Sequence, residues 1–143
     1  MKKLLHRFFA TRPNSPMADL GLLVLRAWLG VAIVCNHGWG KLSHFEEMAD
    51  KFGDPLHLGT HASLALATFA EFFCGLLLAL GLLSRFAALV LCINLAVAFT
   101  AVHQLSLSGP HSGELAFVYL AGFVALLIAG PGKYSIDSSL FKS

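Results

Sequence analysis

Four apolar runs in this 143-residue chain are each long enough to cross a lipid bilayer. A spanning helix needs roughly 20 residues, because it rises about 1.5 Å per residue and the hydrocarbon core is about 30 Å thick. Lipid offers no hydrogen-bond partners to backbone amides, so each run is expected to be α-helical. We therefore predict an all-α fold, an integral membrane antiparallel four-helix bundle, with spans at about Leu20–Gly40, His61–Leu83, Phe86–Leu105 and Gly113–Gly130.

The composition supports a membrane protein and argues against a soluble one. Hydrophobic residues make up 57% of the chain and charged residues 13%, whereas globular domains have roughly 45–50% and about 25%. Too few polar side chains are present to cover a water-soluble domain of this size. A nucleic-acid binder would need a clustered basic face, and the net charge is only +2. The expected partner is thus the lipid bilayer, with no nucleic acid.

Lysine and arginine lie mostly on one side of the predicted spans, which predicts the orientation. Seven fall on the side of the two termini and two on the other side, so both termini are expected in the cytoplasm. Residues 1–19 form a basic segment, either a short amphipathic helix on the membrane surface or a frayed tail that only sets orientation. The four-helix domain is expected over residues 20–137, followed by a tail over 138–143. The seven are Lys2, Lys3, Arg7, Arg12, Arg85, Lys133 and Lys142, against Lys41 and Lys51.

Ionisable residues inside the spans are costly and must be paired, hydrated or near an end. In the first span Arg26, His37 and Lys41 share one helical face, within about 60° of one another at about 100° per residue. In the second span Glu71 lies on a stripe of small residues at spacing four, which predicts a helix contact. We therefore expect an Arg26–Glu71 ion pair in the bundle interior. Such a pair could serve a ligand, or could only fix the register of the helices.

A second group of polar residues is expected near the side away from the termini. His37, Lys41, His103 and Glu114 all fall within about two turns of that surface. Glu114 begins a stripe in the fourth span that is predicted to face other helices. Histidines there could carry protons or could simply be interfacial residues with satisfied hydrogen bonds. No spacing fixes three ligands together, so no metal site is predicted.

The order of these residues resembles the DoxX family of small bacterial four-helix membrane proteins, over about Leu20 to Asp137. The resemblance implies an inner-membrane protein that is associated with redox complexes, such as a thiosulfate–quinone oxidoreductase or oxidative-stress complexes with soluble partners. It also singles out Arg26, His37, Lys41, Glu71 and Glu114. The residues that carry the resemblance are Leu25-Arg26, Gly30, His37-Gly38-Trp39-Gly40-Lys41, Glu71, Gly75, Leu80-Gly81-Leu82-Leu83-Ser84-Arg85, Glu114 and Gly130-Pro131-Gly132-Lys133-Tyr134-Ser135-Ile136-Asp137.

Three functional hypotheses follow. In the first, the chain is a redox-linked membrane subunit with a polar pocket, lined by Arg26, His37, Lys41, Glu71, His103 and Glu114, for a quinone-like or other small amphiphile. Arg26 or Lys41 would polarise a carbonyl of that molecule, and Glu71 or His37 would exchange protons with it. In the second, it is a non-catalytic assembly subunit that recruits soluble partners, and in the third a carrier of a small solute. The sequence leaves three questions open. They are whether the small-residue stripes form a homo-oligomer, which residues are catalytic, and what the cofactor is, with quinone as one candidate.

Overall fold

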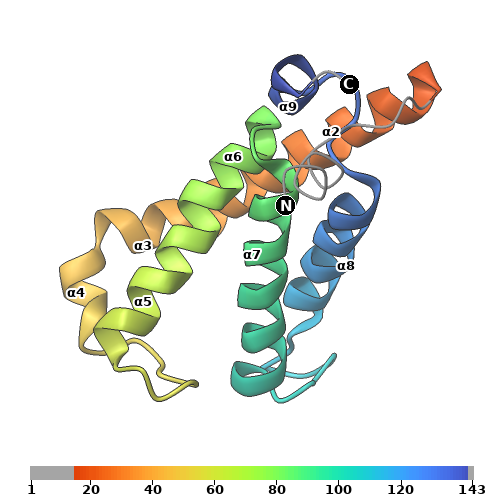
Figure 1. Ribbon diagram of the computed structural model, residues 1–143. Coiled ribbons are helices and arrows are strands. Elements are labelled where there is room, and N and C mark those ends of the chain that lie inside the picture. The colour runs from red at the N-terminus through yellow and green to blue at the C-terminus, as the bar shows by residue number, and fades with distance from the viewer. Residues whose placement is uncertain (1–14, 142–143) are drawn as a thin grey trace.

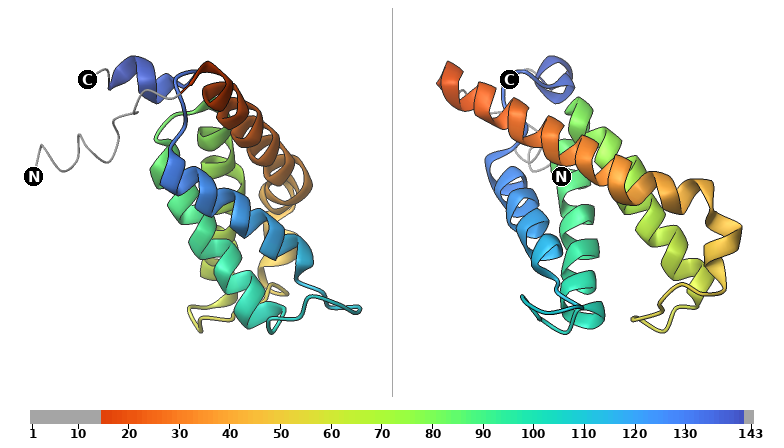
Figure 2. Two further views of the ribbon diagram at one scale, coloured as in Figure 1. Left: turned by 90° about the vertical axis from the view of Figure 1, so that its right-hand side faces the viewer. Right: turned by 180° about the vertical axis from the view of Figure 1, so that it is seen from behind.

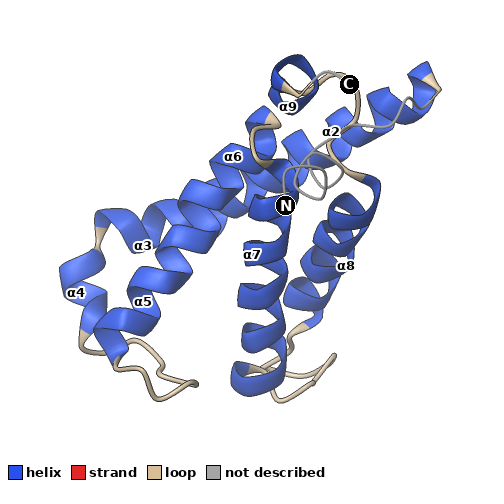
Figure 3. Cartoon of the chain, viewed as in Figure 1, coloured by secondary structure: helices blue, strands red, loops and turns tan. Residues whose placement is uncertain are grey.

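The structure is a computed structural model that describes residues 15–141. Most of the basic segment expected at residues 1–19, and the end of the tail, lie outside the described residues. Figure 3 shows that the described chain consists of helices and loops, with no strand.

Four helical rods run in alternating directions through the molecule (Figure 1). Three of them, Pro16–Ser43, Thr60–Leu80 and Ser84–Val102, are long and apolar enough to cross a membrane, and Glu114–Ala129 is a shorter apolar helix. This confirms the predicted all-α membrane bundle. Each of the first three rods contains a π-helical turn, labelled η. The elements are α2 (Pro16–Ile33), η1 (Val34–Gly38), α3 (Trp39–Ser43), α4 (Phe45–Ala49), α5 (Thr60–Thr68), η2 (Phe69–Cys74), α6 (Gly75–Leu80), α7 (Ser84–Val97), η3 (Ala98–Val102), α8 (Glu114–Ala129) and α9 (Ile136–Leu140).

The rods pack as two pairs, α2 against α6 and α7 along α8, with α2 strongly inclined to α7 (Figures 1 and 2). The first turns of α2 and the helix α9 lie at the same end of the bundle as the turn between α6 and α7. The buried core is built from the faces that the four rods turn toward one another. It includes Ile33, Leu78, Leu91, Phe123 and Leu126.

Glycines allow the first two rods to touch through their backbones. A Cβ atom on Gly30 would lie 2.8 Å from the Ala79 nitrogen and the Gly75 oxygen. A Cβ atom on Gly38 would lie 2.7 Å from the Phe72 nitrogen. The stripes of small residues therefore do form a helix contact, as expected for helices that pack in lipid.

The fourth helix presents a different face to the bundle from the one predicted. Its buried residues are Ala116, Tyr119, Phe123 and Leu126. Of the predicted stripe, Glu114, Val118, Ala121 and Ala125 are exposed, and only Gly122 is half-buried, against Leu29 of the first rod. The prediction that Glu114 points into a helix contact is thus wrong. Every residue from 115 to 129 belongs to an apolar or aromatic type, so hydrophobic periodicity gave no information on which face is buried.

Candidate functional site

The structure brings together side chains from three rods around Glu71. The Lys41 Nζ atom lies 2.5 Å from Glu71 Oε2, and the Asn94 amide donates a hydrogen bond of 3.1 Å to Glu71 Oε1. Lys41 Nζ also lies 3.5 Å from the carbonyl oxygen of His37. We call His37, Lys41, Glu71 and Asn94 the Glu71 cluster. Both carboxylate oxygens have a partner, which offsets the cost of burying this charge.

Local backbone geometry explains why the Glu71 cluster forms where it does. His37 lies in η1 and Glu71 in η2, and these two π turns contact each other. Gly38 has no side chain, so the first rod approaches the backbone of Glu71 and Phe72 closely enough for Lys41 to reach the carboxylate. π turns occur often at functional sites, because they widen a helix locally and re-aim its side chains.

A chain of contacts leads from the Glu71 cluster to the outer surface of the first rod. The His37 ring meets the Tyr119 ring edge to face, with centroids 6.0 Å apart, and His37 experiences the charges of both Glu71 and Lys41. The Asn36 side chain lies close enough to Tyr119 to interact with it. The Asn36 amide in turn donates a hydrogen bond of 2.9 Å to the Ala32 carbonyl.

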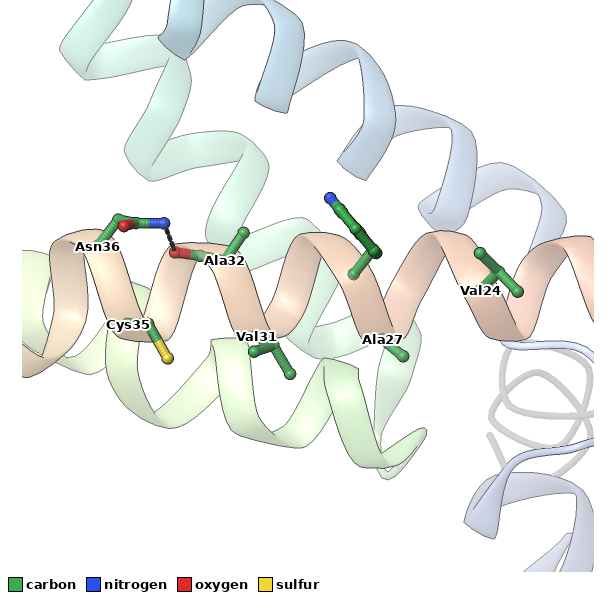
Figure 4. A pocket seen from close by; sticks show the side chains of 7 residues that line it. Val24, Ala27, Val31, Ala32, Cys35 and Asn36 are labelled. Carbon is green, nitrogen blue, oxygen red and sulfur yellow. Dashed lines mark hydrogen bonds between the residues drawn. The ribbon is translucent and has the colours of Figure 1, made fainter.

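Asn36 ends an open groove of about 690 Å³ that runs along the first rod (Figure 4). Apart from this amide, its lining is apolar or weakly polar. Leu29, which follows the lining residue Trp28, packs against Gly122 and places α8 beside this part of the rod. The lining residues are Val24, Ala27, Trp28, Val31, Ala32, Cys35 and Asn36.

Arg26 occupies a separate polar site at the end of the bundle where α9 lies. The side chain is 2% exposed. Its guanidinium donates to the carbonyls of Leu78, at 3.4 Å, and Ala79, at 2.5 Å, and to the carbonyl of Tyr134. Leu78 and Ala79 belong to the last turn of α6, whose carbonyls have no partner within the helix and attract a positive charge.

The predicted Arg26–Glu71 ion pair is therefore wrong. Glu71 is paired with Lys41, and the acidic residue whose charge acts on Arg26 is Asp137. The Asp137 carboxylate accepts hydrogen bonds from the amides of Leu83 and Ser84, at 2.7 and 2.8 Å, and so caps the start of α7. Arg26 thus stabilises the end of α6 and Asp137 the start of α7, on the two sides of the turn that joins these helices.

His103 lies at the end of η3 and Glu114 at the start of α8, both apart from the Glu71 cluster. His103 Nδ1 is 3.1 Å from the His111 carbonyl, and the ring packs against Gly113. Glu114 is exposed in the first turn of α8. Across residues 15–141, no hydrogen bond or ion pair joins either residue to the Glu71 cluster.

The loop between the first two rods is organised by Asp54. Its carboxylate accepts hydrogen bonds from the amides of Leu58 and Gly59 and from the Ser63 hydroxyl, at 2.9, 2.8 and 2.7 Å. The Ser63 hydroxyl, followed by the two amides, lowers the pKa of Asp54. His61 lies nearby, 3.1 Å from Asp50. Within residues 15–141, no group of three or more His, Cys, Asp or Glu side chains is placed to hold a metal ion.

Two partners in these sites were not anticipated from the sequence. The sequence did not connect Asn94, in the third span, to Glu71. Asp137 was placed at the edge of the domain without a role. The glycine contact at Gly38 could have indicated the Lys41–Glu71 pair instead, because an antiparallel packing that sets Gly38 beside Glu71 also brings Lys41 close to that carboxylate.

The fold and the buried charges define a small multi-pass α-helical membrane protein. The sequence model of the DoxX family matches residues 21–104, and the chain belongs to this family. It is 32% identical to the inner membrane protein YqjF of Escherichia coli, over 88% of this chain and 96% of that one. It is 30% identical to the uncharacterized membrane protein Rv3486 of Mycobacterium tuberculosis (78% and 82%) and 29% identical to an uncharacterized protein of Haemophilus influenzae (87% and 86%). No solved structure matches the chain.

Proposed function

We propose that this chain is an inner-membrane subunit, with both termini in the cytoplasm, that binds a quinone-like amphiphile and works with redox or oxidative-stress partner proteins. The observation that carries the proposal is the apolar groove that ends at Asn36, one residue from His37. Asn36 connects through Tyr119 and His37 to the Glu71 cluster. An elongated apolar molecule with one polar end matches this arrangement.

The groove and the Glu71 cluster would divide the recognition of such a molecule. Binding sites for small molecules typically measure about 300–1,000 Å³ and combine an apolar lining with a few placed polar groups. An isoprenoid or acyl tail would lie along Val24 and Val31, and a carbonyl or hydroxyl would meet Asn36. Lys41 supplies a positive charge near that end, and Glu71 or His37 would exchange a proton when the head group changes its redox state.

Arg26 has no part in this proposal, because its guanidinium is engaged by three backbone carbonyls at the other site. His103 and Glu114 also lie outside the path from the groove to Glu71. The proposed ligand-binding residues are thus narrowed to Asn36, His37, Lys41 and Glu71, with Asn94 as the residue that positions the carboxylate.

The cysteines provide the experiment. Cys35 lines the groove and is exposed, whereas Cys74 and Cys92 are buried, so a membrane-permeant maleimide should label Cys35 first in the native protein. A short-tailed ubiquinone analogue should slow this labelling in a saturable manner. Filling the groove with Val31→Trp should abolish the protection. The matched control is Ile93→Trp on α7, because Val31 and Ile93 are 54% and 58% exposed.

A second arm tests the polar end of the site. Glu71→Gln keeps the size of the side chain and removes its charge, so it should weaken protection by the quinone analogue several-fold. A plain hydrocarbon of equal length should protect poorly in every variant. Equal protection by quinone and hydrocarbon would mean that the groove takes any apolar chain. Protection that survives both Val31→Trp and Glu71→Gln would refute the site.

A further inference from the structure

The C-terminal segment has its polar side turned inward and its apolar side turned outward. Ser135 and Asp137 are 7% and 2% exposed. Tyr134, Ile136 and Leu140 are 48%, 39% and 63% exposed. This is the reverse of the pattern of a helix that packs on a water-soluble protein, where the apolar side faces the core.

Hydrogen bonds on the inner side fix this orientation. The Asp137 carboxylate accepts the Leu83 and Ser84 amides, and the Asp137 amide donates to the Gly81 carbonyl at 2.9 Å. Arg26 donates to the Tyr134 carbonyl. α9 would lose these bonds if it rolled over to bury Ile136 and Leu140, so its apolar side is held facing away from the bundle.

The surface next to α9 indicates what covers it. The Lys133 amide donates a hydrogen bond of 3.0 Å to Asp19 Oδ1, and Gly132 lies against Leu22, so this segment adjoins the first turns of α2. Met17 and Leu20 on those turns are exposed, on a rod that is apolar enough to cross the membrane. The chain that leads into α9 thus adjoins exposed apolar residues of α2, on a rod that is apolar enough to cross the membrane.

The residue types on the outward side are those of a lipid interface. Tyrosine is enriched where hydrocarbon meets water. Tyr134 is exposed on this side, and the exposed Lys133 precedes it. A lysine at a membrane surface keeps its charge among lipid head groups while its aliphatic stem covers apolar surface. Anionic head groups would complement that charge.

We propose that residues 133–140 form an interfacial clasp that lies in the head-group region of the bilayer, with Ile136 and Leu140 inserted among the acyl chains. The clasp joins the turn between α6 and α7 to the membrane surface through Asp137 and Arg26. This proposal does not depend on quinone binding or on any redox role of the Glu71 cluster.

The test places an environment-sensitive nitrobenzoxadiazole probe on α9 in the full-length protein. Leu140→Cys is labelled in a Cys35→Ala background, which leaves only the buried Cys74 and Cys92. The protein is reconstituted in vesicles of phosphatidylethanolamine and phosphatidylglycerol. Ile128→Cys on the exposed side of α8 serves as the lipid reference, and Ser108→Cys in the α7–α8 link serves as the water reference.

The clasp predicts that the probe at position 140 is shifted to the blue, like the probe at 128. It should lose fluorescence with spin-labelled lipid and not with aqueous iodide. Iodide quenching equal to that at position 108 would overturn the proposal and leave α9 as a solvated tail. Protection from both quenchers would overturn it too. Energy transfer between labelled copies would then indicate that a second molecule of the protein covers α9. Loss of the protection on removal of residues 1–14 would instead indicate that this segment of the chain covers it.

Discussion

The sharpest prediction concerns Gly38, where the first two rods touch. In Gly38→Ala the new methyl group would lie 2.7–2.8 Å from backbone atoms of Glu71 and Phe72. Carbon atoms pack at about 3.5 Å or more, so the rods must separate by roughly 0.7 Å. Overpacking of this kind typically costs about 1–3 kcal/mol. The upper half of that range is expected, because the obstructing atoms are backbone and cannot rotate away.

Gly40→Ala is the matched control. Gly40 lies two residues further along the same rod and a Cβ atom there meets nothing within 4 Å. Both substitutions gain the same helix propensity, about 1 kcal/mol, so the difference between the two variants isolates the steric cost. Unfolding by sodium dodecyl sulfate in mixed micelles, followed by circular dichroism, measures both free energies. Trp39, whose ring lies 6.1 Å from Phe72, should change its fluorescence only in Gly38→Ala. Equal stabilities would refute the close contact of the rods.

Three further predictions concern the charged groups. Lys41→Met and Glu71→Gln should each lower the free energy of unfolding by about 2–3 kcal/mol in the same titration. This is below the roughly 3–5 kcal/mol of fully buried pairs, because the two side chains are 16% and 11% exposed. The double variant should lose less than the sum of the two single losses, and additive losses would mean that the two residues are not coupled. Arg26→Lys should lose about 1.5–3 kcal/mol, since an ammonium lacks the fork that reaches three carbonyls; an unchanged midpoint would contradict this. The lowered pKa of Asp54 stabilises the loop fully above its unfolded value near 3.8, and this contribution is lost as the pH falls through the lower folded value. The protection factors of the loop amides, which correct for the intrinsic pH dependence of exchange, should therefore fall only below that pH, and a fall near neutral pH would exclude Asp54 as its cause.

The sequence predicted the number and position of the rods well, and their ends less well. The first rod begins at Pro16, where Ser15 accepts the Ala18 amide at 3.2 Å, and continues to Ser43. The prediction of Leu20–Gly40 followed the apolar residues alone. Serine before proline is a helix-start signal that could have extended it.

The predicted pairing of Arg26 with Glu71 had the correct helix faces but the wrong register between the first two rods. Arg26 and Lys41 do both point at the second rod, as their helical phase predicted. Arg26 lies opposite residues 78–79, however, so Glu71 is seven or eight residues away, about 11 Å along the rod. Depth estimated from the ends of apolar runs carries an error of this size, because those ends were displaced by several residues. The contact between Gly30 and Gly75 fixes the register directly.

The π turns themselves could not be predicted from the sequence. His37 and Glu71 both lie in segments where the backbone hydrogen bond changes from four to five residues, and the residues of η1 and η2 are ordinary apolar and polar types with no common signature. The two buried charges also differ in what holds them. Arg26 is bound by backbone carbonyls at helix ends, so its partners move only if the fold opens. Glu71 is bound by the side chains of Lys41 and Asn94, which can rotate without unfolding a helix. Because these partners can move within an intact bundle, the proposed ligand site is centred on Glu71, whereas Arg26 is given a structural role.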